Sequence, residues 1–350
     1  LDPLLDHLKR VEENQNPIDN VANLSNLRVE FHSGKLVAYW TNANGRASNE
    51  MFLSATAASQ LSQEVLPTRF FVGLKQLANI DGVGENIATD AWNKFASLLT
   101  PDRAAPNLVR TVNMKLNGQV HRVIRSCHSK TYAPYSNRQF LDDLLAYAPE
   151  LSQLHLVNVL LTDSTMRLRF VVLDQTDNLY LLTGQDPLLM RPTQMIEVWN
   201  SEVGLRRVGL RAGLWRPICT NSVCHWSDKT EYNWIHRGKN GSLKIQSGVQ
   251  GAIPQLIQSA NEVVTAYEAA KFVEIGPVSE WLDKKLEKVE WVGAEFIARA
   301  KKAITDPSTT PGETLASGID AITLASQSCE VFVQDDLERL ASVLLHEGLE

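Results

Sequence analysis

The sequence predicts an α+β protein with an antiparallel meandering sheet and a few packed helices, followed by an acidic helical C-terminal part. Up to about residue 250, short segments alternate apolar and polar residues between glycine-containing turn signals, which is typical of strands. After Gly251, apolar residues recur at helical spacing through several successive segments. We therefore expect a core domain at residues 1–250 and a helical subdomain at residues 251–350.

The N-terminal part alternates helix and strand patterns. A short amphipathic pattern in residues 1–25 predicts a loosely docked helix and a linker. Two strands at 27–31 and 35–40 flank the turn signal Ser33-Gly34. A helical pattern runs from Ser54 to just before Pro67, and a second helix is expected at 88–99.

The middle of the chain predicts most of the sheet. Its strongest local signal is Asn117-Gly118, a dipeptide typical of a two-residue hairpin turn. Segments with strand alternation follow as far as residue 219. The expected strands cover residues 107–115, 120–125, 154–161, 166–173, 179–182, 195–198, 203–210 and 215–219.

One helix, at 139–147, interrupts these strands. Asn137 precedes it and suits the N-cap position, and Asp142 and Asp143 stand near its start, where carboxylates suit the helix dipole. We interpret these three residues as helix-terminal groups rather than catalysts. Beyond residue 250 only helices are expected, with a linker at 306–311. They cover residues 253–267, 279–303, 313–327 and 335–346.

The composition is that of an ordinary globular protein: 350 residues, of which 44% are hydrophobic and 21% are charged. No apolar run approaches the ~18–20 residues that span a bilayer, and the N-terminus lacks the pattern of a signal peptide. The four cysteines show no disulfide-scaffold spacing. We expect a cytoplasmic protein with reduced thiols and no membrane partner.

The charge is unevenly distributed along the chain. Between Asp102 and Lys244 there are 18 Lys and Arg against 12 Asp and Glu, whereas the whole chain carries a net charge of −6. A basic middle between acidic flanks suggests a surface for a polyanion. The alternative is that charged strand faces simply point at solvent, and charge alone does not separate the two interpretations.

Residues 197–236 hold four of the eight tryptophans, two of the four cysteines and four closely spaced arginines. This segment contains Asn-Ser-Glu-Val-Gly, then Cys-Thr-Asn, then a later histidine. It resembles the prokaryotic domain-of-unknown-function 932 family of phage/plasmid-like proteins. The resemblance implies a phage or plasmid setting and no settled activity. The residues that carry it are Asn200, Ser201, Glu202, Gly204, Cys219, Asn221 and His236.

Basic side chains are interleaved with aromatic ones in two segments, which is typical of proteins that bind single-stranded nucleic acid. Arginines would contact phosphates while rings stack on unpaired bases. The phage and plasmid setting favours DNA over RNA and a role in annealing, recombination or replication, within a homo-oligomer. The candidate binding residues are Arg122, Arg125, Lys130, Tyr132, Tyr135, Arg138, Arg206, Arg207, Arg211 and Arg216. For any single tryptophan nearby, a place in the core is the better interpretation.

Signals for catalysis are weak. Cys219, Cys224, His225 and His236 form the only metal-like cluster, but their spacing does not fit a zinc site, so we expect no metal and no cofactor. No Gly-x-Ser-x-Gly elbow is present, and Cys127 and His128 are sequence neighbours that a strand would point to opposite faces. Two alternatives to nucleic-acid binding stay open. One is an enzyme built around Cys219, Asn221 and His236, and the other is a structural, oligomer-forming phage or plasmid protein.

Overall fold

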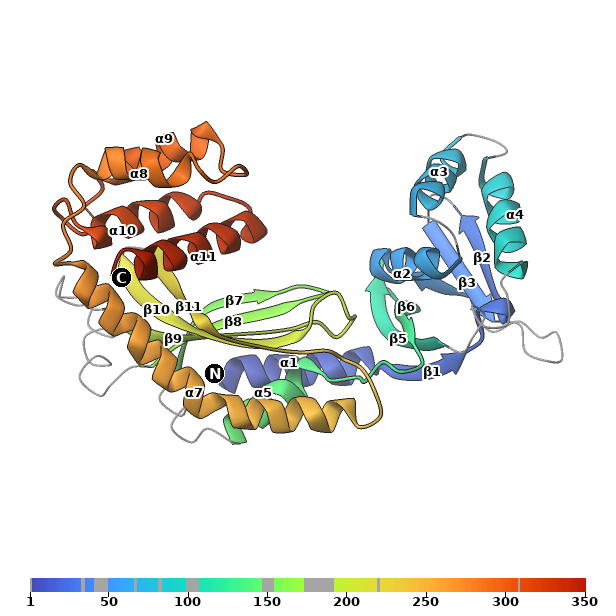
Figure 1. Cartoon of the computed structure of the whole chain (residues 1–350). Helices are drawn as coiled ribbons and strands as arrows, with labels where there is room; N and C mark the ends of the chain where they lie inside the picture. The colour runs from blue at the N-terminus through green and yellow to red at the C-terminus, as the bar shows by residue number, and fades with distance from the viewer. Residues whose placement is uncertain are drawn as a thin grey trace.

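The computed structural model describes the chain apart from residues 1, 33–34, 41–49, 66–67, 81–83, 99–106, 147–153, 173–191, 219–220 and 308. The fold is α+β, with one sheet in each of two lobes and a helical C-terminal region (Figure 1). No helix in the described part of the chain is long and apolar enough to cross a membrane.

The first lobe contains a mixed six-stranded sheet in the order β1-β5-β6-β4-β3-β2. All of its pairings are antiparallel except the parallel pair β4 and β6, which corrects the expectation of a purely antiparallel sheet. Its strands are β1 (Ile18–Ala22), β2 (Leu27–His32), β3 (Lys35–Trp40), β4 (Met51–Leu53), β5 (Asn107–Leu116) and β6 (Gln119–Ser129).

Three helices complete this lobe: α2 (Ala55–Val65), α3 (Thr68–Ala78) and α4 (Gly84–Ser97). They pack on the sheet around buried Phe31, Leu61 and Trp92. The expected hairpin is confirmed, because Asn117 (φ 50°) and Gly118 (φ 84°) occupy the left-handed region that its two-residue turn requires. Helix α3 and the edge strand β1 were not expected. The turn signal Ser33-Gly34 lies outside the described residues.

The second lobe contains an antiparallel five-stranded sheet in the order β11-β10-β9-β8-β7, so strands that follow one another in the chain are neighbours. The strands are β7 (Leu154–Leu161), β8 (Met166–Val172), β9 (Thr193–Asn200), β10 (Val208–Ile218) and β11 (Asn221–Trp234). Strand β10 is continuous where two strands were expected, and residues 201–207 form a turn. Strand β11 was not expected, and the expected strand 179–182 lies outside the described residues.

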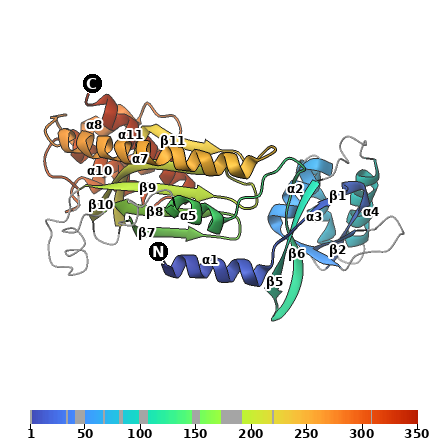
Figure 2. The same ribbon diagram turned by 90° about the horizontal axis from the view of Figure 1, so that it is seen from below.

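One face of this sheet is covered by α1 (Asp2–Gln15), α5 (Asn137–Ala146) and α7 (Gly241–Ala270), as Figures 1 and 2 show from two sides. The core between them is apolar and includes Leu168, Phe170, Ile196, Val198, Leu210 and Leu256. The expected boundary at residue 250 falls inside α7. This helix begins at Gly241, about three turns before residue 253, where the sequence pattern indicated its start.

Four further helices follow: α8 (Val278–Leu286), α9 (Ala294–Ala303), α10 (Leu315–Ser326) and α11 (Val331–Glu347). The single helix expected at 279–303 is two helices, α8 and α9. Helix α11 lies against the other face of the five-stranded sheet, where Trp226 donates from its backbone N–H to the hydroxyl of Ser342 at 2.7 Å. The sheet is thus held between α7 and α11 (Figure 1).

Candidate functional site

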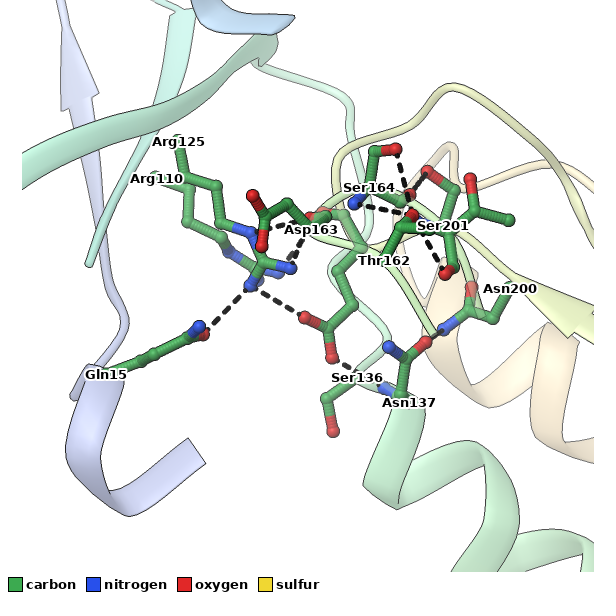
Figure 3. A network of polar contacts seen from close by, with 12 residues as sticks. Gln15, Arg110, Arg125, Ser136, Asn137, Thr162, Asp163, Ser164, Asn200 and Ser201 are labelled. Atoms are coloured by element: carbon green, nitrogen blue, oxygen red, sulfur yellow. Dashed lines mark hydrogen bonds and ion pairs between the residues drawn. The ribbon is translucent and has the colours of Figure 1, made fainter. Parts of the chain in front are cut away.

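The turn at 201–207, between β9 and β10, carries three of the seven residues of the family-like motif and lies where the two lobes meet (Figure 3). The hydroxyl of Ser201 donates to the carbonyl of Ser164 at 2.6 Å and accepts from the backbone N–H of Leu205 at 3.0 Å. Gly204 has φ 71°, and a Cβ there would lie 2.8 Å from the ring of His128. A glycine is therefore required at 204, both for its backbone angle and for the close approach of this ring.

Glu202 connects this turn to three elements. Its carboxylate accepts from Nη1 of Arg125 on β6 at 2.9 Å and from the backbone N–H of Asn137 at the start of α5 at 2.7 Å. Its backbone carbonyl accepts from Nη1 of Arg110 on β5 at 3.3 Å and from the hydroxyl of Tyr132 at 3.2 Å. A carboxylate that reaches both lobes in this way fixes how they dock.

Arg110 and Arg125 are also held by other groups. Arg110 forms a two-pronged ion pair with Asp19 at 2.7 and 2.8 Å. Burial by itself would lower the pKa of Arg110, but the hydrogen bond and charge of Asp19, together with Glu202 and Tyr132, outweigh burial and raise this pKa. Arg125 donates to the side chain of Gln15 at 3.1 Å and to the carbonyl of Asp163 at 2.7 Å (Figure 3). The two arginines line a cavity of about 290 Å³ beside α1 and the start of α5.

The start of α5 is built differently from the expectation. Ser136, not Asn137, caps the helix, because its hydroxyl accepts from the backbone N–H of Gln139 at 3.1 Å. The side chain of Asn137 instead accepts from Nδ2 of Asn200 at 3.0 Å, which places the motif asparagine against the helix start (Figure 3). Asp143 accepts from the hydroxyl of Tyr135 at 2.6 Å and so has a structural role.

Behind this network, three rings stack. His128 and Tyr132 have centroids 3.7 Å apart with planes at 9°, and Tyr132 and His236 have centroids 5.2 Å apart. Burial, with Arg110 and His236 nearby, lowers the pKa of His128 to about 4, and burial also lowers the pKa of His236. Burial raises the pKa of Tyr132. Tyr132 lies between two rings and Tyr135 is fully buried, so neither tyrosine presents a free face to a base.

Several of the expected phosphate-binding arginines are held by other groups of the protein. Arg211 and Arg216 are 1% and 4% exposed, and they pair with Glu197 at 2.7 Å and with Asp320 at 2.6 Å. Arg122 donates to the carbonyl of Asn16 at 2.8 Å and to Thr111 and Asn113 at 3.0 Å. These three side chains therefore hold elements together. Arg138 is partly exposed between Glu12 and Asp142, Arg206 is partly buried, and Arg207 is exposed.

A different group of cations is exposed. Lys130, Arg237, Lys239 and Lys244, which we call the basic edge, have no ion pair with any described residue. The backbone N–H of Gly238 donates to the carbonyl of Thr131 at 2.7 Å, which joins the chain around Lys130 to the start of α7. Sequence reasoning missed three of these cations, because about a hundred residues separate them from Lys130. The only signal for them was the net positive charge up to Lys244.

The metal-like cluster is not assembled by the described residues. Cys219 lies outside them, as do the side chains of Asn221, Cys224 and His225. Nδ1 of His236 lies 3.2 Å from the carbonyl of Ala133. Within the described ranges no group of three or more His, Cys, Asp or Glu side chains could hold a metal ion. The expectation of a protein without metal or cofactor stays a prediction.

Comparisons with protein-family models, with curated proteins and with solved structures gave no match. The resemblance to the domain-of-unknown-function 932 family therefore stays a prediction, although four of its motif residues, Asn200, Ser201, Glu202 and Gly204, converge in one network with Arg110 and Arg125.

Proposed function

We propose that the protein binds single-stranded nucleic acid through the basic edge. The observation that carries this proposal is the grouping of four exposed cations at the N-terminus of α7, a helix of 30 residues. Phosphates are attracted both by lysine and arginine side chains and by the partial positive charge at a helix N-terminus. The basic edge offers both attractions in one place.

Exposed apolar side chains beside these cations favour an unpaired strand. Leu205, Ile235 and Leu243 are 56%, 57% and 59% exposed and come from the segments that carry or adjoin the basic edge. Unpaired bases expose apolar faces that such side chains contact, whereas a duplex keeps its bases stacked inside. The resemblance to phage and plasmid proteins makes DNA the expected strand, annealing or recombination the expected process and the cytoplasm the expected compartment.

The test replaces three cations of the basic edge together: Arg237→Gln, Lys239→Gln and Lys244→Gln. Each phosphate contact that the substitutions remove should lower the slope of log affinity against log salt by ~0.7, so three contacts should lower it by ~2. The measurement is fluorescence anisotropy with a labelled oligonucleotide over a salt series. The matched control replaces three exposed lysines of the helical C-terminal part, Lys284, Lys288 and Lys302, by Gln. It changes net charge equally and should keep the wild-type slope.

Two results contradict the proposal: a wild type that does not bind the oligonucleotide at low salt, or a triple variant that binds as the control does. In either case the protein-assembly function takes precedence. Phe272 and Trp291 favour that alternative, because they are 85% and 55% exposed in the helical C-terminal part.

A further inference from the structure

A second group of arginines surrounds a cavity of about 210 Å³ on the α11 side of the five-stranded sheet. Arg206 and Arg207 come from the turn before β10, Arg211 from β10 and Arg339 from α11. We call this cavity the arginine pocket. It shares no residue with the basic edge or with the network around Glu202.

Arg211 is the deepest residue of the pocket, with 1% of its surface exposed. Its Nη2 pairs with Glu197 at 2.7 Å and with Asp335. Its Nε and Nη1 have no hydrogen-bond partner among the described residues. The guanidinium lies over the ring of Trp226, 3.7 Å from its centroid, which partly offsets the cost of its burial. An acceptor that enters the cavity would offset the cost of the N–H groups that have no partner.

The carboxylates of the pocket are already engaged. One oxygen of Glu197 accepts from Arg211, and the other accepts from Arg167 and Arg169, both at 2.7 Å. These three arginines outweigh the effect of burial and lower the pKa of Glu197 to about 2, so its charge is fully developed at neutral pH.

The other two carboxylates of the pocket are also paired with arginines. Asp335 also accepts from Arg167 at 2.9 Å, and Glu231 pairs with Arg339 at 2.5 Å. Four arginines and three carboxylates line the pocket, which leaves an excess of one positive charge. Burial, followed by the charge of Arg167, lowers the pKa of Arg206, as expected where cations crowd together.

We propose that the arginine pocket binds a phosphate group. Its oxygens match the planar fork of a guanidinium, and a phosphate would supply the acceptors that Nε and Nη1 of Arg211 lack. The volume accommodates a phosphate together with part of an attached group. Arg207 is exposed and lines the same cavity, so it is placed to close over the ligand. The source is either free phosphate or the terminal phosphate of a nucleotide or strand.

The first experiment titrates the full chain with inorganic phosphate by calorimetry, in a buffer of constant ionic strength. Wild type should bind, and Arg207→Gln should weaken binding about tenfold, since it removes a charged fork from the ligand. Arg207→Lys should recover part of the affinity, because it restores the charge without the fork. Lys288→Gln, which removes one exposed charge from the helical C-terminal part, should bind phosphate as the wild type does.

The second experiment compares two oligonucleotides that differ only in a terminal phosphate. Tighter binding of the phosphorylated strand, abolished in Arg207→Gln and kept in Lys288→Gln, identifies a strand end as the source. Equal binding of both strands, with phosphate binding intact, identifies free phosphate. The proposal is overturned if wild type neither binds phosphate nor prefers the phosphorylated strand, or if Arg207→Gln and Lys288→Gln weaken phosphate binding equally. Loss of strand binding in the basic-edge triple variant alone would leave this proposal unaffected.

Discussion

His128 and His236 are the two residues whose chemistry the fold changes most clearly. Both rings are packed against Tyr132, and Arg110 lies near enough to disfavour a second positive charge. Their Nε2 atoms are buried without a described partner. At neutral pH the rings are therefore uncharged packing groups. Protonation would add a buried charge, and the N–H at Nε2 would have no hydrogen-bond acceptor among the described residues.

The stack should make the protein less stable in mild acid. The pKa values of these two histidines in the folded protein lie below the unfolded value of about 6.5. As the pH falls below 6.5, the unfolded chain therefore binds more protons at these two side chains than the folded protein does. The contribution of the uncharged histidines to the free energy of unfolding is fully present above about pH 6.5 and is lost as the pH falls towards 4. It amounts to ~1.4 kcal/mol for each unit by which the folded pKa lies below the unfolded one. Urea unfolding of wild type and His128→Gln at a series of pH values measures this.

In His128→Gln the free energy of unfolding should fall less steeply with pH than in wild type. The control is His155→Gln, which changes an exposed histidine on β7 and should keep the wild-type slope. Equal slopes in all three proteins would show that the stack does not govern the acid response.

At the scale of elements, α7 has the largest influence on the second lobe. It crosses β9, β10 and β11 and buries Ile245, Val249, Ile253 and Leu256 against them (Figure 2). Its contact with β11 depends on Gly248, because a Cβ there would lie 2.1 Å from Nε1 of Trp234. Three residues further on, a Cβ at Gly251 would meet nothing within 4 Å.

This pair of glycines gives a matched test of how α7 packs. Gly248→Ala should destabilise the protein by ~1–3 kcal/mol, because the ring of Trp234 or the helix must shift. Gly251→Ala should stabilise it by ~0.5–1 kcal/mol, because alanine restricts the unfolded chain and meets no obstacle. Thermal unfolding of the two variants beside wild type measures both effects. If Gly248→Ala is as stable as Gly251→Ala, α7 does not pack against Trp234 as described.

For the whole molecule, the junction between the lobes depends on the connection of α1 and on the turn at 201–207. Helix α1 packs on the five-stranded sheet through Leu8, yet the chain continues from it into β1 of the other sheet (Figures 1 and 2). Glu202 and Arg125 add a direct ion pair, and Nε2 of Gln60 on α2 donates to the carbonyl of Val203 at 2.7 Å. The lobes are thus joined by covalent, ionic and hydrogen-bonded links in one place.

Limited proteolysis tests the continuity of α7 across the expected boundary at residue 250. Chymotrypsin should cleave after Phe272, which is 85% exposed just beyond the helix, before it cleaves after Tyr267, which is fully buried. Mass spectrometry of the early fragments identifies the site. An early trypsin or chymotrypsin fragment that ends near residue 250 would instead support a domain boundary inside α7 and contradict its burial.

The elements that the sequence determined by itself are those set by neighbouring residues. Asn117-Gly118 specified the hairpin of β5 and β6, because few other dipeptides accept two positive φ angles. The helical spacing of apolar residues specified the second half of α7 and most of α10 and α11. Local geometry and periodicity are properties of short segments, so they are visible before the chain is folded.

Only the tertiary structure decided which charged residues are buried, which are exposed and which meet. Arg211 and Arg207 look alike in the sequence, yet one is enclosed by Glu197 and α11 while the other is exposed. Three other features were likewise decided only by the tertiary structure. They are the parallel pairing of β4 with β6, the edge strand β1 and the approach of Lys130 to the start of α7. Each depends on contacts between segments far apart in the chain, whose energies come from burial and pairing that no local pattern encodes.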